Sequence, residues 1–297
     1  MSLVSRYLQP SLVERLNHMQ LTARSVVQGS TSGLHKSLLK GASVEFRQHR
    51  PYVPGDEPRR LDWRLLARTD RPFVKEYDEE TNLRCVIVLD RSGSMAYAGG
   101  GRATKFDYAA RLVASLAYLM LAQTESVGLS VAGKSLESWL PPASGHSQLS
   151  RVIDMLERAT PAGPAAVSAA INQVADRIDR RLLVIIVSDL FEPAPAIRSA
   201  LARLRYARHE TICLRVLDPD EQEFPFRTWS HFRGFEHEPA YLCEPALVRQ
   251  SYLANFNRHR DELEEACRSL RSECHTFLTN RPMIDLLTKM LHRRAMV

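Results

Sequence analysis

The sequence predicts an α/β protein with a doubly wound, mostly parallel sheet flanked by helices, preceded by an irregular N-terminal α+β segment. Two uninterrupted apolar runs, at 85–89 and 182–187, are typical of strands buried on both faces of a parallel sheet. Between and after these runs, strand-length and helix-length segments alternate, as they do in consecutive βαβ units. These observations together predict this fold class.

The N-terminal part has the least regular pattern. A capping-box spelling at Ser11 and a glycine at position 29 predict the ends of its helix. The elements expected there are, in order, a helix at 11–28, a strand at 43–53, a Pro-Gly-Asp turn at 54–56 and a strand at 73–80. We therefore expect two domains, an N-terminal segment at 1–81 and an α/β domain at 82–297.

In the second domain, hydrophobic periodicity defines each element. The expected strands lie at 85–89, 127–132, 135–140, 182–187, 210–217 and 274–279. The expected helices lie at 104–122, 147–158, 165–179, 195–207 and 246–272, and a last helix begins at Pro282. Residues 220–243 are expected to be irregular, and the aromatic stretch 224–235 within them either forms a groove for a partner or folds over the sheet edge.

Composition limits the function classes. The 297 residues are 44% hydrophobic and 25% charged, which is typical of globular proteins. The net charge of +6 comes from dispersed arginines, so nucleic-acid binding is not favoured. Five cysteines without a Cys-x-x-Cys pair fit a reducing compartment. With no signal peptide and no membrane-spanning stretch in the sequence, we expect a soluble cytoplasmic protein.

Polar residues follow two of the buried strands. Asp90, Ser92 and Ser94 come after the run at 85–89, and Asp189 comes after the run at 182–187. Because the carboxyl ends of parallel strands meet at one edge of a sheet, these side chains are expected to lie together. Carboxylate and hydroxyl oxygens are ligands suited to Mg²⁺ or Mn²⁺. The alternative is that these residues only cap the helices that follow.

The segment Val88–Met95 resembles the first loop of a von Willebrand factor type A domain, whose metal-ion-dependent adhesion site uses an Asp-x-Ser-x-Ser motif. The resemblance implies metal ligation by Asp90, Ser92 and Ser94 in the first loop and by Asp189 in the third. In the second loop, the expected threonine and its neighbouring acid are replaced by Ala165 and Ala166. This departure predicts a weakened or vestigial site unless Thr160 or Ser168 compensates.

Further segments resemble the family of domain of unknown function 58. They are Gly41–Arg47, Arg50–Asp56, Arg59–Trp63, Ala67–Arg68, Lys75–Tyr77 and Glu80. The resemblance covers the chain from about residue 30 onward. It implies a non-enzymatic interaction or adaptor module that acts with a MoxR-type AAA+ ATPase and a protein client. Long members of the family carry membrane segments, which this sequence lacks.

The segment from Arg50 to Trp63 has two interpretations. Arg50, Tyr52, Asp56, Asp62 and Trp63 are candidate partner-binding residues. Alternatively, the Asp and Arg side chains form a network that fixes an irregular segment, and Trp63 anchors it by packing.

Two other functions compete with the adaptor. A metal-dependent phosphotransfer enzyme would also place an Asp at a strand end, but its chemistry needs a second Asp where this chain has Ser92. Weak nucleic-acid binding through arginines would show a steep salt dependence. A zinc site is not favoured, because the histidines and cysteines lack ligand spacing.

Overall fold

The computed structural model describes residues 6–8, 10–19, 21, 44–53, 56, 61–79, 83–235 and 240–295, although not the side chains of 44–48, 75–79 and 295. The described residues form two compact units. The larger unit combines 6–21 with 83–295, and the smaller one contains 44–79. The edge of the smaller unit lies next to the expected boundary at 81–82, but the N-terminal helix, which we grouped with that segment, belongs to the larger unit.

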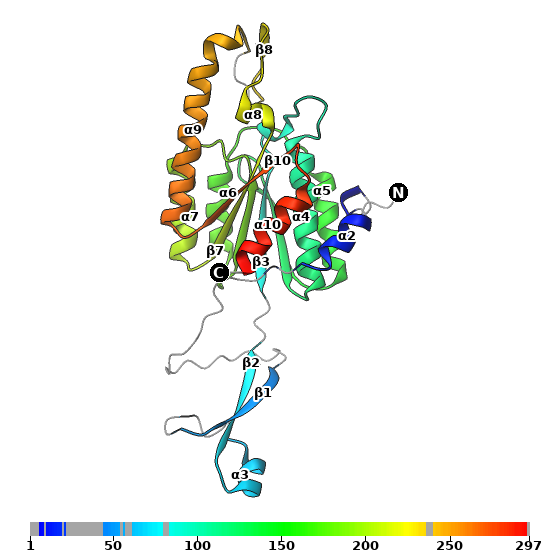
Figure 1. Ribbon diagram of the computed structural model, residues 1–297, viewed down its shortest axis with the longest axis vertical. Helices are drawn as coiled ribbons and strands as arrows, with labels where there is room; N and C mark the ends of the chain where they lie inside the picture. The colour runs from blue at the N-terminus through cyan, green and yellow to red at the C-terminus, as the bar shows by residue number, and fades with distance from the viewer. Residues whose placement is uncertain are drawn as a thin grey trace. The chain divides into compact units, whose positions relative to one another are not determined.

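A six-stranded sheet forms the centre of the larger unit (Figure 1). Its strands are β10 (Glu273–Leu278), β7 (Glu210–Leu217), β6 (Leu183–Ser188), β3 (Arg84–Asp90), β4 (Ser126–Ala132) and β5 (Leu136–Ala143), in that spatial order. All neighbours pair in parallel except β4 and β5, which form an antiparallel edge. The expected fold class, a mostly parallel sheet flanked by helices, is confirmed.

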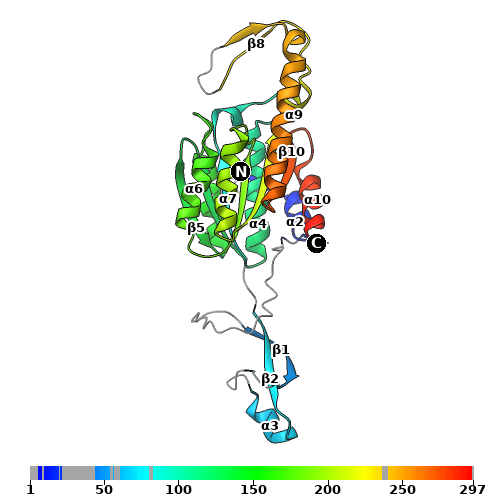
Figure 2. The same ribbon diagram turned by 90° about the vertical axis from the view of Figure 1, so that its left-hand side faces the viewer.

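Helices cover both faces of the sheet (Figure 2). The helices of this unit are α2 (Pro10–Leu16), α4 (Lys105–Ala122), α5 (His146–Arg158), α6 (Val167–Arg177), α7 (Ala194–Tyr206), α8 (Pro219–Glu223), α9 (Pro245–Ser269) and α10 (Met283–Ala295). Side chains of α2, α4, α5 and α10 form one hydrophobic core with one face of the sheet, and those of α6, α7 and α9 form a second core with the other. None of the helices in the described residues is long and apolar enough to cross a membrane.

Strand β3 shows why residues 85–89 form an uninterrupted apolar run. Ile87 and Leu89 point into the first core, whereas Val86 and Val88 point into the second, and all four are fully buried. Since both faces of this strand are covered, no position between the half-buried Arg84 at its start and Asp90 at its end needs a polar side chain. The strand thus places the carboxylate of Asp90 at the carboxyl edge of the sheet.

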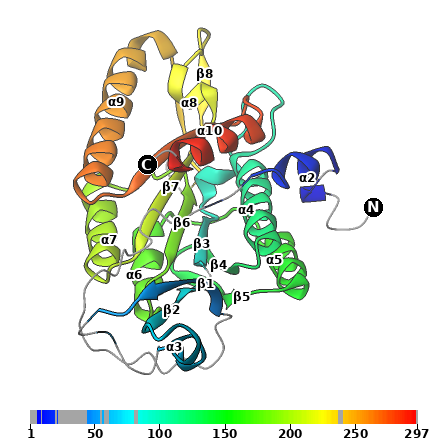
Figure 3. The same ribbon diagram turned by 60° about the horizontal axis from the view of Figure 1, so that its bottom comes forward.

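Helix α2 is shorter than expected, and the prediction of a helix over 11–28 is wrong at its C-terminal end. The helix ends at Leu16, and the backbone N–H of Met19 donates to the carbonyl of Leu16 in a turn. The side chain of Gln123, next to the end of α4, donates to the carbonyl of Met19 at 2.9 Å. These contacts with α4 stop the helix where local propensity would continue it. Figure 3 shows α2 beside α4. Ser11 lies inside α2, so it is not the cap, and residues 22–28 fall outside the described part.

The smaller unit contains the hairpin strands β1 (Val44–Pro51) and β2 (Phe73–Glu79), with α3 (Trp63–Thr69) between them. The two strands expected at 43–53 and 73–80 are therefore confirmed. Asp62 caps α3, because its carboxylate accepts from the backbone N–H groups of Arg64 and Leu65. The turn expected at 54–56 is described only at Asp56, whose N–H donates to the carbonyl of Val53 at 3.0 Å; positions 54 and 55 lie outside the described residues.

Residues 219–243 depart from the irregular structure expected at 220–243. They contain helix α8 and two short antiparallel strands, β8 (Ser230–Phe232) and β9 (Tyr241–Cys243). The sequence signal was weak because each strand has three residues, which is too short for alternation to be recognised.

The packing of α2 on the rest of the larger unit can be tested with Leu16→Ala. Leu16 is fully buried in the first core, so removing its side chain should lower the free energy of unfolding by about 2–5 kcal/mol. Urea denaturation measures this. Tyr206→Ala, which truncates an exposed side chain of α7, should change stability by less than about 0.5 kcal/mol. Equal stability of the two variants would contradict the packing.

Candidate functional site

The polar residues that follow β3 and β6 meet at the carboxyl edge of the sheet. Asp90 accepts a hydrogen bond from the backbone N–H of Ser92 at 2.7 Å and another from the hydroxyl of Ser188 at 2.6 Å. Ser94 donates to Oδ2 of Asp189 at 2.6 Å, and the hydroxyls of Ser92 and Ser94 lie 3.1 Å apart. The structure thus brings together all four residues expected at this edge, and we call them, with Ser188, Lys105 and Glu221, the strand-end cluster.

Ser188, Lys105 and Glu221 are not among the residues expected from the sequence, and Lys105 is the one cation among these three. It is the first residue of α4, its side chain is 0% exposed, and its ammonium donates to Oδ2 of Asp189 at 2.7 Å. The same ammonium contacts Oε1 of Glu221, in α8, at 2.5 Å. A lysine at the first position of a helix opposes the helix dipole. That local mismatch was the sequence signal that could have indicated it.

The pKa values of two members of the strand-end cluster, Asp90 and Lys105, are shifted from their ordinary values. Burial, with the nearby Asp189 carboxylate as a second cause, raises the pKa of Asp90 to about 7. For Lys105, burial alone would lower the pKa, but the carboxylates of Asp189 and Glu221 outweigh it and hold the pKa above its ordinary value. The ammonium of Lys105 therefore keeps its charge inside the protein.

A second buried cation, Arg215, contacts the backbone of Asp189. The Nε of Arg215, in β7, donates to the backbone carbonyl of Asp189 at 3.0 Å. The guanidinium lies over the rings of Phe191 and Phe256, at 5.6 and 5.2 Å from their centroids. The ammonium of Lys105 lies 4.9 Å from the centroid of Phe191. The two cations thus share one aromatic ring, which offsets part of the cost of burying them.

The end of β7 adds an ion-pair network beside the cluster. Asp218 caps α8, and its carboxylate accepts from both Nε and Nη2 of Arg102, at 3.1 and 2.7 Å. The hydroxyl of Thr279 donates to the same carboxylate at 2.9 Å. Because Glu221 completes the capping box of α8 while it contacts Lys105, this network fixes the Glu221 carboxylate.

Neither candidate for compensating the altered second loop contributes to the cluster. Ser168 donates to the carboxylate of Glu192, and the backbone carbonyl of Thr160 accepts from Arg91 at 2.9 Å. Ala165 and Ala166 have no oxygen on their side chains. The second loop approaches the first one through backbone, because the N–H of Gly93 donates to the carbonyl of Gly163 at 2.7 Å.

The oxygen atoms that could coordinate a metal in this cluster do not fit a divalent cation. Each carboxylate oxygen of Asp90 and Asp189 already accepts a hydrogen bond from the protein. The ammonium of Lys105 bridges the carboxylates of Asp189 and Glu221. Within the described ranges, no group of three or more His, Cys, Asp and Glu side chains is arranged to hold a metal ion.

Most of the cluster is closed to solvent. Asp90, Ser92 and Asp189 are buried, whereas Ser94 is half-buried. The backbone of Phe235 lies over the first loop, so closely that a Cβ on Gly93 would come within 2.4 Å of its carbonyl oxygen. The ring of Phe235 packs edge-to-face on Tyr97, with centroids 6.2 Å apart. A partner's carboxylate therefore has no open route to the oxygens of Asp90, Ser92 and Asp189.

The candidate partner-binding residues lie in the smaller unit, where they have mixed roles. Arg50 donates to Asp56 at 2.8 Å, and Asp62 pairs with His49 at 3.0 Å besides capping α3. These contacts agree with the interpretation of Asp56 and Asp62 as a structural network. Trp63 is 64% exposed, so the prediction that it anchors the segment by packing is wrong. Tyr52 is half-buried.

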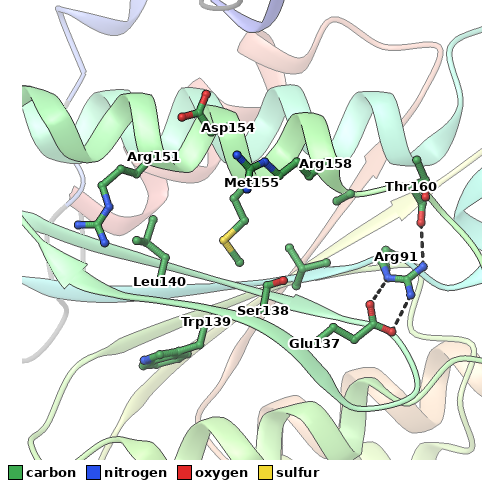
Figure 4. A pocket seen from close by; sticks show the side chains of 12 residues that line it. Arg91, Glu137, Ser138, Trp139, Leu140, Arg151, Asp154, Met155, Arg158 and Thr160 are labelled. Atoms are coloured by element: carbon green, nitrogen blue, oxygen red, sulfur yellow. Dashed lines mark hydrogen bonds and ion pairs between the residues drawn. The ribbon is translucent and has the colours of Figure 1, made fainter.

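A pocket of about 520 Å³ lies between α5 and β5 (Figure 4). Arg91, which follows the first-loop Asp90, forms one end of the pocket and is paired with Glu137. None of the oxygens of the strand-end cluster lines the pocket. It is therefore a feature separate from the cluster.

Comparison with known proteins indicates the family. The model of the family described as protein of unknown function DUF58 matches residues 48–262. The uncharacterized protein Rv1480 of Mycobacterium tuberculosis is 30% identical over 224 residues, which are 73% of this chain and 68% of that protein. The resemblance to this family noted from the sequence is confirmed.

Solved structures with a similar arrangement are distant in sequence. BatB from Bacteroides thetaiotaomicron is 15% identical, with a TM-score of 0.47 over 72% of this chain and 100% of that chain. The SpRpn10 VWA domain is 11% identical, with a TM-score of 0.39 over 69% of this chain and 93% of that chain.

The ion-pair network at the end of β7 can be tested with Asp218→Asn. This variant keeps the shape of the side chain but removes the fully buried carboxylate and leaves Arg102 paired with Asp220 alone, so the free energy of unfolding should fall by about 1–3 kcal/mol. Chemical denaturation measures the loss. The matched control is Asp261→Asn, which removes an exposed carboxylate paired with Arg260 and should cost less than about 0.5 kcal/mol. If the network did not contribute to stability, the two variants would lose the same free energy of unfolding.

Proposed function

Because this chain belongs to the DUF58 family and carries an exposed apolar projection beside a closed polar cluster, we propose that it is a non-enzymatic protein-interaction module. Its partner in this proposal is a MoxR-type AAA+ ATPase, with which it acts as an adaptor for a protein client. The choice of that partner rests on the family resemblance, and the surface that would bind it is argued from the structure.

The observation that carries the proposal is an apolar surface that we call the arm. The arm is formed by the segment that contains β8 and β9 and by the start of α9, which extend beyond the end of the sheet (Figures 1 and 2). Its exposed large apolar side chains are Trp229, Phe235, Tyr241, Leu242 and Leu247. Apolar side chains concentrated on one projection are typical of a protein-binding surface, whereas single exposed ones carry no such meaning.

The base of the arm is held by packed aromatic rings. Phe224 stacks on Phe232 at 5.6 Å and contacts Phe226 and Tyr252, at 5.1 and 4.6 Å between centroids. Tyr252, in α9, also donates to the backbone carbonyl of Glu221 at 2.8 Å. One set of aromatic residues in 224–235 therefore packs as a core, while Trp229 and Phe235 stay exposed. A surface held in place before binding loses less entropy when it binds.

The residues of the strand-end cluster argue against the alternative of a metal-dependent phosphotransfer enzyme. The carboxylates that would act as nucleophile or base, Asp90 and Asp189, are buried. Among the described residues, no histidine is within hydrogen-bond distance of them, and Lys105 is paired with two carboxylates. A substrate would have to open the cluster to reach them. These features support a non-catalytic role.

The arm can be tested directly with Trp229→Ala and Leu242→Ser. These side chains are 66% and 65% exposed, so the variants should fold normally, yet each should raise the Kd for the purified MoxR-type ATPase of the same organism about tenfold or more. Calorimetry or surface-immobilised binding measures Kd. Tyr206→Ala, on α7 and 92% exposed in the wild type, is the matched control and should bind as the wild type does.

Two results would contradict the proposal in different ways. Wild-type affinity in a Trp229→Ala, Leu242→Ser double variant would remove the arm from the interface. No binding of the wild type at tens of micromolar ATPase, with and without nucleotide, would remove the partner.

The smaller unit also exposes two large apolar side chains, Val53 and Trp63, and the N–H of Val53 donates to Asp56, which is paired with Arg50. We propose that these side chains contact the client, with Tyr52 and Asp62 in supporting positions. Trp63→Ala should weaken capture of a client by the adaptor–ATPase complex several-fold and leave ATPase affinity unchanged, as measured by co-sedimentation with the purified proteins. A parallel loss of both affinities would assign Trp63 to the ATPase interface instead.

A further inference from the structure

The strand-end cluster has an unusual charge composition for a site that resembles a metal centre. The carboxylates of Asp189 and Glu221 contact the Lys105 ammonium, the Asp90 carboxylate interacts with that of Asp189, and the Arg215 guanidinium donates to the backbone carbonyl of Asp189. If all five groups are charged, these two cations leave one net negative charge. A divalent ion would reverse this excess and add a positive charge to a buried place, where charge without a partner is costly.

Lys105 also bridges two of the carboxylates of the cluster, and one of them, Asp189, is a candidate metal ligand. Its ammonium joins a third-loop carboxylate, Asp189, to a carboxylate on another element, Glu221. The hydroxyl of Ser94 from the first loop donates to the same Oδ2 of Asp189. A cation in a metal site of this type would likewise hold the first loop to Asp189, and here the two are joined by the Ser94–Asp189 hydrogen bond beside Lys105. An ammonium with three N–H donors can do so with fixed protein groups alone.

We propose that the Lys105 ammonium is the resident cation of the strand-end cluster and takes the role of a divalent metal ion. The cluster is then a metal-independent clamp that joins the start of α4 to the ends of β3 and β6 and to α8. It does not present an open metal coordination position to a partner's carboxylate. This inference goes beyond the proposed function, because it holds whether or not the arm binds the ATPase.

Metal titration of the full wild-type chain is the first test. We expect no saturable heat with Mg²⁺ or Mn²⁺ up to about 5 mM. We also expect the same Tm, within 1 °C, in EDTA and in 5 mM of either ion. Saturable binding that is lost in Asp90→Ala would overturn the proposal, because it would show that the cluster holds a metal beside Lys105.

Replacement of the lysine is the second test. Lys105→Met keeps the length of the side chain but leaves Asp189 and Glu221 without their cation, so Tm should fall by about 10 °C. Lys134→Met, at an exposed lysine after β4, should leave Tm unchanged. A Tm of Lys105→Met within 1 °C of the wild type would overturn the proposal, because a resident cation cannot be removed without loss. If Lys105→Met does not fold, the wild-type titration decides alone.

These tests are separate from those of the proposed function. Loss of ATPase binding in the arm variants with a metal-free wild type would support both proposals. Metal-dependent Tm together with arm-dependent binding would overturn only the role of Lys105.

Discussion

The buried pair of Lys105 and Asp189 is the interaction on which the carboxyl edge of the sheet depends. Burying an ammonium and a carboxylate is costly unless each is paired and hydrogen-bonded, and here Ser94, Glu221 and the ring of Phe191 complete their surroundings. Since these groups come from the first loop, α8 and the end of β6, the requirement to satisfy one charge fixes several elements at once. The position of α8 then determines where the arm begins.

The architecture could be predicted because its signals are local and repeated. Strand β3 is apolar at each position from 85 to 89 because both of its faces are covered. Chain segments whose ends are decided by distant contacts could not be predicted in this way. Helix α2 ends at Leu16 because Gln123, more than a hundred residues later, binds the backbone after it. The strands β8 and β9 are too short for periodicity to indicate them.

In the candidate site, too, some residues could be predicted from the sequence and others could not. The positions of Asp90 and Asp189 follow from the rule that parallel strands end at one edge, so their proximity could be predicted from two apolar runs. Lys105 lies outside any motif, and its unfavourable position at the start of α4 is the one local sign that it turns inward. Its role appears only when the carboxylates of Asp189 and Glu221 are seen on either side of it. Sequence motifs indicated the ligands but not the group that neutralises them.

The close contact between Gly93 and the carbonyl of Phe235 has a mechanical consequence. The arm rests directly on backbone of the first loop, and that loop is tied through Asp90 and Ser188 to the ends of two central strands. A pulling force applied at the arm would therefore load the strands of the sheet along their length. Parallel strands that are pulled along their length share the force among many backbone hydrogen bonds, so the sheet would resist a force applied at the arm.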